Sequence, residues 1–195
     1  MAEFSIATLR ELGTRLNTEH TLEDYREDHR LAAVLILAYP DDREPHIVLT
    51  RRTHHLPNHA GQISFPGGSI EAGDRDPVHT ALREAREEIN LDDNDVDVLG
   101  ILDVTVLPSG FAVAPVLAVS DRQPALQPNP DEVAEIFSIP LSMISDLTRY
   151  RQDFLERDGV RRQFYYLNYG KYYIWGATAR MLRDLAGLLR EDSGR

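Results

Sequence analysis

The amino-acid sequence predicts one mixed α/β domain. Apolar runs over residues 31–38 and 111–119 have the length of buried strands. Residues 77–89 and 177–189 instead repeat apolar side chains every three or four positions, as amphipathic helices do. The chain of 195 residues has the size of a single domain and contains no internal repeat and no obvious linker.

The N-terminal part is predicted to contain a helix and three strands. Residues 5–16 carry apolar side chains at positions 6, 9, 12 and 16, the spacing of a short amphipathic helix. An acidic connector over 17–29 is expected at the surface. The strand over 31–38 is followed, after a turn, by a strand over 46–50 that pairs back onto it, and a short strand over 62–65 ends at a Pro-Gly-Gly turn.

A helix is predicted to begin at Pro77 and to end near Asn90. Asp76 is a favourable N-cap, and proline is favoured at the first helical position. Apolar side chains at positions 78, 82, 85 and 89 form the buried stripe. Asn90 tolerates the left-handed backbone conformation that ends many helices.

The remaining chain is predicted to add four strands and two helical segments. Strands over 96–106 and 111–119 are separated by a Leu-Pro-Ser-Gly sequence. The later elements are a strand over 133–139, a helical turn near 141–147, a strand over 163–169 and a helix over 177–189.

Composition excludes several classes of protein. The chain has 21 Lys and Arg against 32 Asp and Glu, a net charge of −11, so a basic nucleic-acid-binding face is not expected. It contains no cysteine, which excludes disulfides and thiolate metal sites. The first residues lack a secretory pattern, and the longest apolar run is far shorter than the roughly 20 residues that span a bilayer. We expect a soluble, cytoplasmic protein with neither nucleic-acid nor membrane partners.

Three glutamates lie within little more than one turn of the predicted helix over 77–89. Glu84 and Glu88 are four residues apart and share a helix face, with Glu87 beside them. Like charges at this spacing each cost about 0.2–0.5 kcal/mol on an exposed helix. A solvated charged face would be the simpler interpretation of the cluster alone, but a glycine-rich turn at 65–68 precedes it. Hard oxygen ligands beside a glycine loop indicate a site for a divalent cation and a diphosphate.

This segment resembles the Nudix box, the glycine-loop-helix motif of enzymes that hydrolyse nucleoside diphosphates linked to another moiety. The family pattern runs Gly, five residues, Glu, seven residues, then Arg-Glu-apolar-x-Glu-Glu-x-Gly-apolar. It maps onto Gly68, Asp74, Arg83, Glu84, Glu87, Glu88 and Asn90. The resemblance implies a Nudix α/β/α sandwich, with a mixed β-sheet between helices, over residues 30–195. Residues 1–29 would then form an N-terminal helix and connector packed on that domain.

Three features depart from the family pattern. Asp74 replaces the first Glu, eight residues instead of seven separate it from Arg83, and Asn90 replaces the helix-ending Gly. The helical glutamates are unaffected. We expect Asp74, Arg83 and Asn90 to support the structure of the motif, with Arg83 orienting Glu87.

The preceding residues are similar to the extra motif of the coenzyme A pyrophosphatase subgroup of this family. The matching positions are Thr50, Arg52, Gly61, Phe65, Pro66, Gly67 and Gly68. Pro57 stands where the motif has an arginine. The extra residue before the Arg-Glu sequence of the box and the segment 173–179 also resemble this subgroup.

The resemblance implies metal-assisted attack of water on a phosphorus atom. Glu84 and Glu88 are the expected metal ligands, followed by Glu87 and the backbone carbonyl of Gly68, in a shell suited to Mg²⁺ or Mn²⁺. Two or more ions are expected during turnover.

The identity of the general base is left open. Glu87 and Glu88 are catalytic candidates within the motif. Glu132 and Glu135, beside the predicted strand over 133–139, could reach in from outside it, although a surface carboxylate is the simpler interpretation of either one.

The expected substrate-binding residues are Gly67, Gly68, Arg51, Arg52 and His59. Arg51 and Arg52 follow a strand and should point to opposite faces, so only one of them is expected at the cleft, and we favour Arg52. The histidines at 54, 55 and 59 do not have zinc-site spacing, and polar loop residues are the alternative interpretation.

The expected function is hydrolysis of coenzyme A or its derivatives at the diphosphate, to 3′,5′-ADP and 4′-phosphopantetheine species, by a monomer or homodimer. One alternative, favoured by Pro57, is another small nucleoside-diphosphate substrate: ADP-ribose, NADH or a dinucleoside polyphosphate. A second is a Nudix module that binds nucleotides without cleaving them. A third is a structural protein without a saturable metal site.

Overall fold

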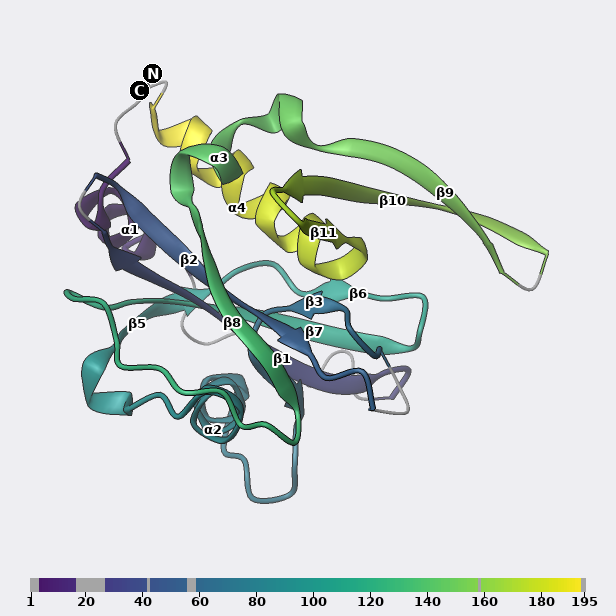
Figure 1. Ribbon diagram of the computed structural model, residues 1–195, viewed down its shortest axis with the longest axis horizontal. Coiled ribbons are helices and arrows are strands. Elements are labelled where there is room, and N and C mark those ends of the chain that lie inside the picture. The colour runs from purple at the N-terminus through teal and green to yellow at the C-terminus, as the bar shows by residue number, and fades with distance from the viewer. Residues whose placement is uncertain (1–3, 17–26, 42, 56–58, 158, 194–195) are drawn as a thin grey trace.

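A mixed β-sheet covered by helices on both faces forms the body of the protein. The structure is a computed structural model that describes residues 4–16, 27–41, 43–55, 59–157 and 159–193. Figure 1 shows α2 (Pro77–Ile89) on one face of the sheet, with α1 (Ile6–Gly13) and α4 (Gly176–Ser193) on the other. The predicted α/β/α sandwich is thereby confirmed.

Within the described residues the larger sheet has eight strands, and its main path runs β3-β2-β1-β7-β5. The strands are β1 (Arg30–Pro40), β2 (Pro45–Arg52), β3 (Ile63–Ser64), β4 (Gly67–Ser69), β5 (Asp97–Ile101), β6 (Thr105–Val106), β7 (Phe111–Val119) and β8 (Val133–Pro140). The central strands β1 and β7 are parallel, from Arg30 opposite Phe111 to Ala38 opposite Val119, whereas β2 pairs antiparallel with both β1 and β8. Strands covered on both faces are apolar throughout, which explains the continuous run over 31–38.

Alternation along the strands divides the interior into two apolar layers. The layer under α2 includes Leu35, Val48, Ala85 and Ile89. The layer under α1 and α4 includes Leu9, Ile36, Leu49 and Leu182. Helix α1 therefore contributes to the main core, while residues 17–26 of the predicted connector lie outside the described part of the chain.

The helix ends follow the capping signals in the sequence. Ser5 accepts a hydrogen bond from the backbone N–H of Thr8 and completes a capping box at the start of α1. Asp76 accepts a hydrogen bond from the backbone N–H of His79, 2.7 Å away, at the start of α2. Asn90 ends α2 with φ 53° and ψ 40°, as predicted. The shorter helical elements are α3 (Leu141–Ser145) and the 3₁₀ turns η2 (Asp93–Asp95) and η3 (Leu147–Arg149).

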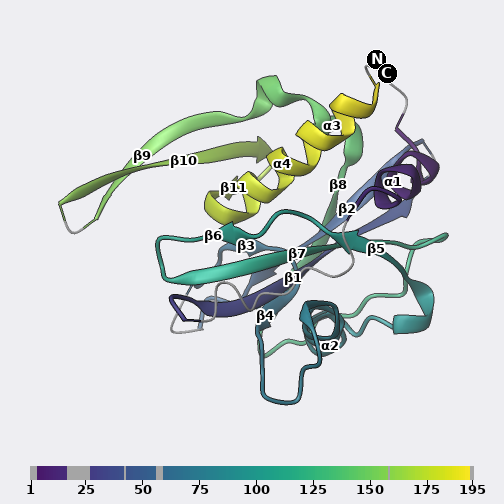
Figure 2. The same ribbon diagram turned by 180° about the vertical axis from the view of Figure 1, so that it is seen from behind.

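A second antiparallel sheet packs against α4 in the order β11-β10-β9. Its strands are β9 (Arg151–Arg157), β10 (Val160–Tyr169) and β11 (Tyr172–Trp175). Leu167 and Ile174 are fully buried in the layer under α4. Figures 1 and 2 show the β9–β10 hairpin extending away from the body of the molecule.

Three parts of the structure differ from the sequence prediction. The predicted strand over 96–106 is divided into β5 and β6. The strand β4 forms where only a turn was expected, because the glycines pair with β1. β9 and β11 were not predicted, and the side chains of 151–156 are all exposed, so no hydrophobic period marks β9. Among the described residues, no helix is both long enough and apolar enough to cross a membrane.

Candidate active site

The glycine strand β4 runs against β1 and beside α2. Gly67 and Gly68 pair with Val34 and Ala33 of β1. A Cβ atom on Gly67 would lie 2.5 Å from the carbonyl oxygen of Ala33, so a larger residue would displace the sheet backbone. A Cβ atom on Gly68 would instead collide with the carboxylate of Glu84. The first glycine is therefore required by the sheet, and the second leaves room for a glutamate of the acidic helix.

Glu88 is the buried acid of the site. Its side chain is 2% exposed, and its Oε1 lies 3.5 Å from Nη1 of Arg52. Its Oε2 accepts a hydrogen bond from the backbone N–H of Gly67 at 3.3 Å. Burial raises the pKa of Glu88 to about 8, opposed by the charge of Arg52 and the Gly67 N–H and reinforced by the charges of Glu84 and Glu132. An unpaired charge inside a protein is costly, and Arg52 at 3.5 Å compensates the charge of Glu88 only in part. A bound cation would therefore stabilise the charged form of Glu88.

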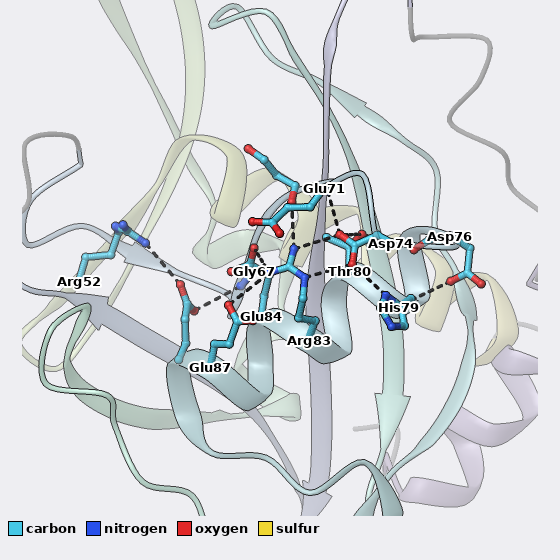
Figure 3. Close-up of polar contacts among 12 residues, drawn as sticks. Arg52, Gly67, Glu71, Asp74, Asp76, His79, Thr80, Arg83, Glu84 and Glu87 are labelled. Atoms are coloured by element: carbon cyan, nitrogen blue, oxygen red, sulfur yellow. Dashed lines mark hydrogen bonds and ion pairs between the residues drawn. The ribbon is translucent and has the colours of Figure 1, made fainter.

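Arg83 bridges the other two glutamates of the helix. Its Nη1 lies 3.0 Å from Oε1 of Glu84 and 3.2 Å from Oε2 of Glu87, and Figure 3 shows the three side chains together. Burial raises the pKa of Glu84, while the charge of Arg83 opposes this shift. The side chain of Glu87 is 53% exposed. The helix thus presents one buried, one mostly buried and one exposed carboxylate.

Asp74 anchors the loop between β4 and α2. Its side chain is 1% exposed, and Arg83 contacts it side-on, with Nε 3.1 Å from Oδ1 and Nη2 3.0 Å from Oδ2. It also accepts hydrogen bonds from the backbone N–H of Glu71 and the hydroxyl of Thr80, and lies 2.8 Å from Nδ1 of His79. The hydrogen bonds from Arg83 hold the pKa of Asp74 well below its usual range. Asp74 therefore makes a buried contact with Arg83 although it replaces the first Glu of the family pattern and lies one residue further from the arginine (Figure 3).

Sequence reasoning missed His79 and Thr80 as partners of Asp74. These contacts cross the boundary between a loop and a helix, where no regular spacing identifies them. The only signal was local: both residues lie in the first turn of α2, directly after the Asp76 cap.

The two arginines at the end of β2 point to opposite faces of the sheet, as the alternation predicts. Arg52 points to the α2 face, and Arg51 lies directly opposite Glu135 in the ladder with β8. The partners of Glu135 are Arg51 at 3.0 Å, Lys171 at 2.9 Å and Tyr172 at 2.7 Å. The structure therefore does not bring Arg51 or Glu135 to the glutamates of α2, because strand alternation directs both side chains toward α4.

Glu132 and His59 occupy different environments. Glu132 lies in the turn after Asn129, whose backbone N–H donates to the carbonyl of Glu88 at 2.9 Å, and its charge helps to raise the pKa of both Glu84 and Glu88. His59 is exposed, adopts a left-handed conformation with φ 57°, and lies 2.8 Å from the side-chain oxygen of Gln62 in its own turn. Its contacts place it in a surface turn and do not support the predicted role of His59 in substrate binding beside the glutamates of α2. Pro57 lies outside the described residues.

The residues of this site fit a divalent cation. Glu84, Glu87 and Glu88 provide the hard oxygen ligands that Mg²⁺ and Mn²⁺ prefer. Over the described ranges, no three His, Cys, Asp or Glu side chains already surround one point. Arg83 and Arg52 instead contact the three carboxylates. Metal binding therefore requires these glutamates to turn from the arginines toward a shared position.

Comparison with known proteins identifies the family. The family model of the NUDIX domain matches residues 28–158. A protein of Pectobacterium atrosepticum named an uncharacterized Nudix hydrolase NudL is 43% identical over 159 residues, which are 80% of this chain and 81% of that protein. A Yersinia pestis protein of the same name is 40% identical over 160 residues, 81% of this chain and 79% of that protein.

Solved structures support the same fold. A C. elegans Ap4A hydrolase has a TM-score of 0.52 at 17% identity, covering 84% of this chain and 96% of that one. RenU, a Nudix hydrolase from M. smegmatis, has a TM-score of 0.51 at 22% identity, covering 61% of this chain and 74% of that one. At these identities the likeness concerns the fold alone. The matched domain and the extent of its relatives together establish that the chain belongs to the NUDIX domain family.

Proposed function

We propose that this protein is a metal-dependent hydrolase of coenzyme A or its derivatives, which it cleaves at the diphosphate to 3′,5′-ADP and 4′-phosphopantetheine species. Nudix hydrolase activity on a nucleoside diphosphate-linked substrate follows from membership of the family. The observation that carries the reaction class is the buried Glu88 beside Glu84, Glu87 and the glycine strand.

Each residue near Glu88 has a distinct part in the proposed reaction. Glu84, Glu87 and Glu88, with the carbonyl of Gly68, would hold Mg²⁺ or Mn²⁺. Bound divalent cations would neutralise charge on the diphosphate and lower the pKa of water. Arg52 would leave Glu88 as a cation takes its place, and its guanidinium would then contact a phosphate oxygen.

Arg83 and Glu132 complete the arrangement. Asp74 fixes Arg83, which orients Glu84 and Glu87 before the cation binds. Glu132 would accept the proton of the attacking water, because it lies outside the helix in a turn that is bonded to the carbonyl of Glu88. Glu87 is the second candidate for this role.

The choice of coenzyme A rests on the motif over residues 49–68 and on the extra residue before Arg83. The names of the relatives state no substrate. The second candidate is another nucleoside diphosphate, such as ADP-ribose, NADH or a dinucleoside polyphosphate, and the loss of the motif arginine at Pro57 favours it. A non-catalytic binding module is disfavoured, because binding alone does not require three glutamates within little more than one helical turn. A cytoplasmic location and a monomeric or homodimeric state are part of the proposal.

Initial rates with coenzyme A, ADP-ribose and NADH, each with Mg²⁺ and with Mn²⁺, test the substrate. Chromatography of the products should identify 3′,5′-ADP from coenzyme A. Coenzyme A turnover tenfold or more below that of another substrate would refute the substrate choice while leaving the reaction class intact. Full activity of Glu88→Gln would refute the metal assignment.

A further inference from the structure

We propose that Thr53 and His55 are positioning residues for Glu132: their hydrogen bonds to the backbone of Asp131 and Glu132 hold that carboxylate beside the acidic helix. This inference rests on the proposed function, in which Glu132 accepts the proton of the attacking water. Neither residue belongs to the acidic helix, and in the described part of the chain no hydrogen bond or ion pair joins either of them to its glutamates. Both follow directly after β2, at the end of which Arg52 lies.

The loop before β8 forms a compact turn around Asn129. The backbone carbonyl of Asn129 accepts hydrogen bonds from the N–H groups of Glu132 at 3.1 Å and Val133 at 2.8 Å. The side-chain oxygen of Asn129 accepts a third from the N–H of Asp131, also at 3.1 Å. These bonds set the shape of the turn, but they do not by themselves set its place on the protein.

One side of this turn is fixed to the last turn of α2. The backbone N–H of Asn129 donates to the carbonyl of Glu88 at 2.9 Å, and the N–H of Gln127 donates to the carbonyl of Ile89 at 3.0 Å. These carbonyls belong to the free C-terminal end of the helix, where outside donors are needed. The turn is thus attached to the helix that carries Glu84 and Glu88.

The other side is fixed to the end of β2. The backbone N–H of Thr53 donates to the carbonyl of Glu132 at 2.9 Å, and its hydroxyl donates to the carbonyl of Asp131 at 3.4 Å. Nε2 of His55 lies 3.0 Å from that same carbonyl oxygen. A carbonyl oxygen only accepts hydrogen bonds, so Nε2 of His55 carries the proton. Thr53 is buried, which gives its contacts a fixed geometry.

The turn that carries Glu132 therefore joins the two elements that build the site. α2 supplies the glutamates, β2 supplies Arg52, and the turn that carries Glu132 is bonded to both. If the attachment to β2 is lost, the turn keeps its internal bonds but can move relative to the acids. A displacement of about 1 Å is enough to reduce catalysis strongly when a proton acceptor must meet a placed water.

The test compares Thr53→Val, Thr53→Ser, His55→Ala and His55→Gln with the unchanged enzyme. Val removes the hydroxyl and keeps the shape and the backbone bond, whereas Ser and Gln keep a donor. His54→Ala and Asp131→Asn are matched controls, because both side chains are exposed and neither side chain forms one of the hydrogen bonds that attach the turn to the end of β2. Each of Thr53→Val and His55→Ala should lower kcat about fivefold with KM nearly unchanged, as expected for one lost hydrogen bond. Ser and Gln should restore most of the activity, and the controls should match the unchanged enzyme.

A double-mutant cycle separates positioning from a general loss of structure. Glu132→Gln should lower kcat by roughly 10²-fold or more, as expected when a general base is removed. On that background Thr53→Val and His55→Ala should have no further effect, because the group they position is gone. A further drop of the same size as in the unchanged enzyme would overturn the inference.

A second measurement does not depend on activity. Amide hydrogen exchange of residues 129–133 in the metal-free protein should become faster in Thr53→Val/His55→Ala, while exchange in α2 stays the same. Unchanged exchange in 129–133 would overturn the inference, as would full activity of Glu132→Gln. If the enzyme cleaves ADP-ribose or NADH but not coenzyme A, the substrate proposal fails, and the same variants test the positioning role with that substrate.

Discussion

Replacing Glu88 by Gln should stabilise the metal-free protein while abolishing its activity. Glu88 is 2% exposed, and burial raises its pKa to about 8 from a reference of 4.5. The folded protein therefore binds a proton more tightly than the unfolded chain, and stability falls as the pH rises from about 4.5 to about 8. Gln has the same shape as Glu and does not titrate, so the free energy of unfolding of the variant should not fall over this pH range.

The size of the effect follows from the shift. One pKa unit corresponds to about 1.4 kcal/mol. The variant should exceed the unchanged protein in free energy of unfolding by about 1 kcal/mol at pH 5, about 3 kcal/mol at pH 7 and about 4 kcal/mol at pH 8. Urea denaturation in EDTA at these three pH values measures the difference. Glu87→Gln is the matched control, because the side chain of Glu87 is 53% exposed and should give no comparable gain.

Added Mg²⁺ should remove most of this difference at pH 7. A cation that binds only the folded state stabilises it by about 2.7 kcal/mol at 100 times its dissociation constant. The unchanged protein should gain this stability, and Glu88→Gln should not. Two results would refute the conclusion that the charge of Glu88 is buried and only partly compensated by Arg52. One is a variant that is no more stable than the unchanged protein at pH 8 in EDTA, and the other is a stability difference that does not grow with pH.

Two further predictions concern β4 and the loop between β4 and α2. Asp74→Asn should destabilise the metal-free protein by about 3–5 kcal/mol, because it breaks a buried pair with Arg83. Since the folded pKa of Asp74 is depressed, this contribution is lost as the pH falls below about 4, so denaturation curves of the variant and the unchanged protein should converge in acid and stay apart at pH 7. Gly67→Ala should cost about 1–3 kcal/mol of stability because its Cβ meets the backbone of the sheet. Gly68→Ala should cost less stability but weaken Mg²⁺ binding measured by calorimetry, because the atoms nearest to its Cβ belong to the side-chain carboxylate of Glu84 and not to the sheet backbone. Equal stability losses at the two glycines would contradict this distinction.

The residues with short-range patterns were predicted correctly from the sequence. Asp76 and Asn90 form the ends of α2 as expected, because a cap depends only on the few residues around it. The opposite directions of Arg51 and Arg52 follow from the period of a strand. The exposed strand β9 could not be predicted in this way, since its side chains are not sorted by burial.

The sequence by itself determined the acidic helix, the glycines before it and the fold class, because spacing along one element decides which side chains share a face. Only the tertiary structure decided which carboxylates outside that helix meet it. Glu132 and Glu135 are three residues apart and were equal candidates. The ladder between β2 and β8 directs Glu135 to Arg51 on the α4 side, whereas Glu132 lies in the Asn129 turn, which is bonded to the last turn of α2 and to the end of β2. Pairing between distant segments fixes such choices, and no local pattern carries that information.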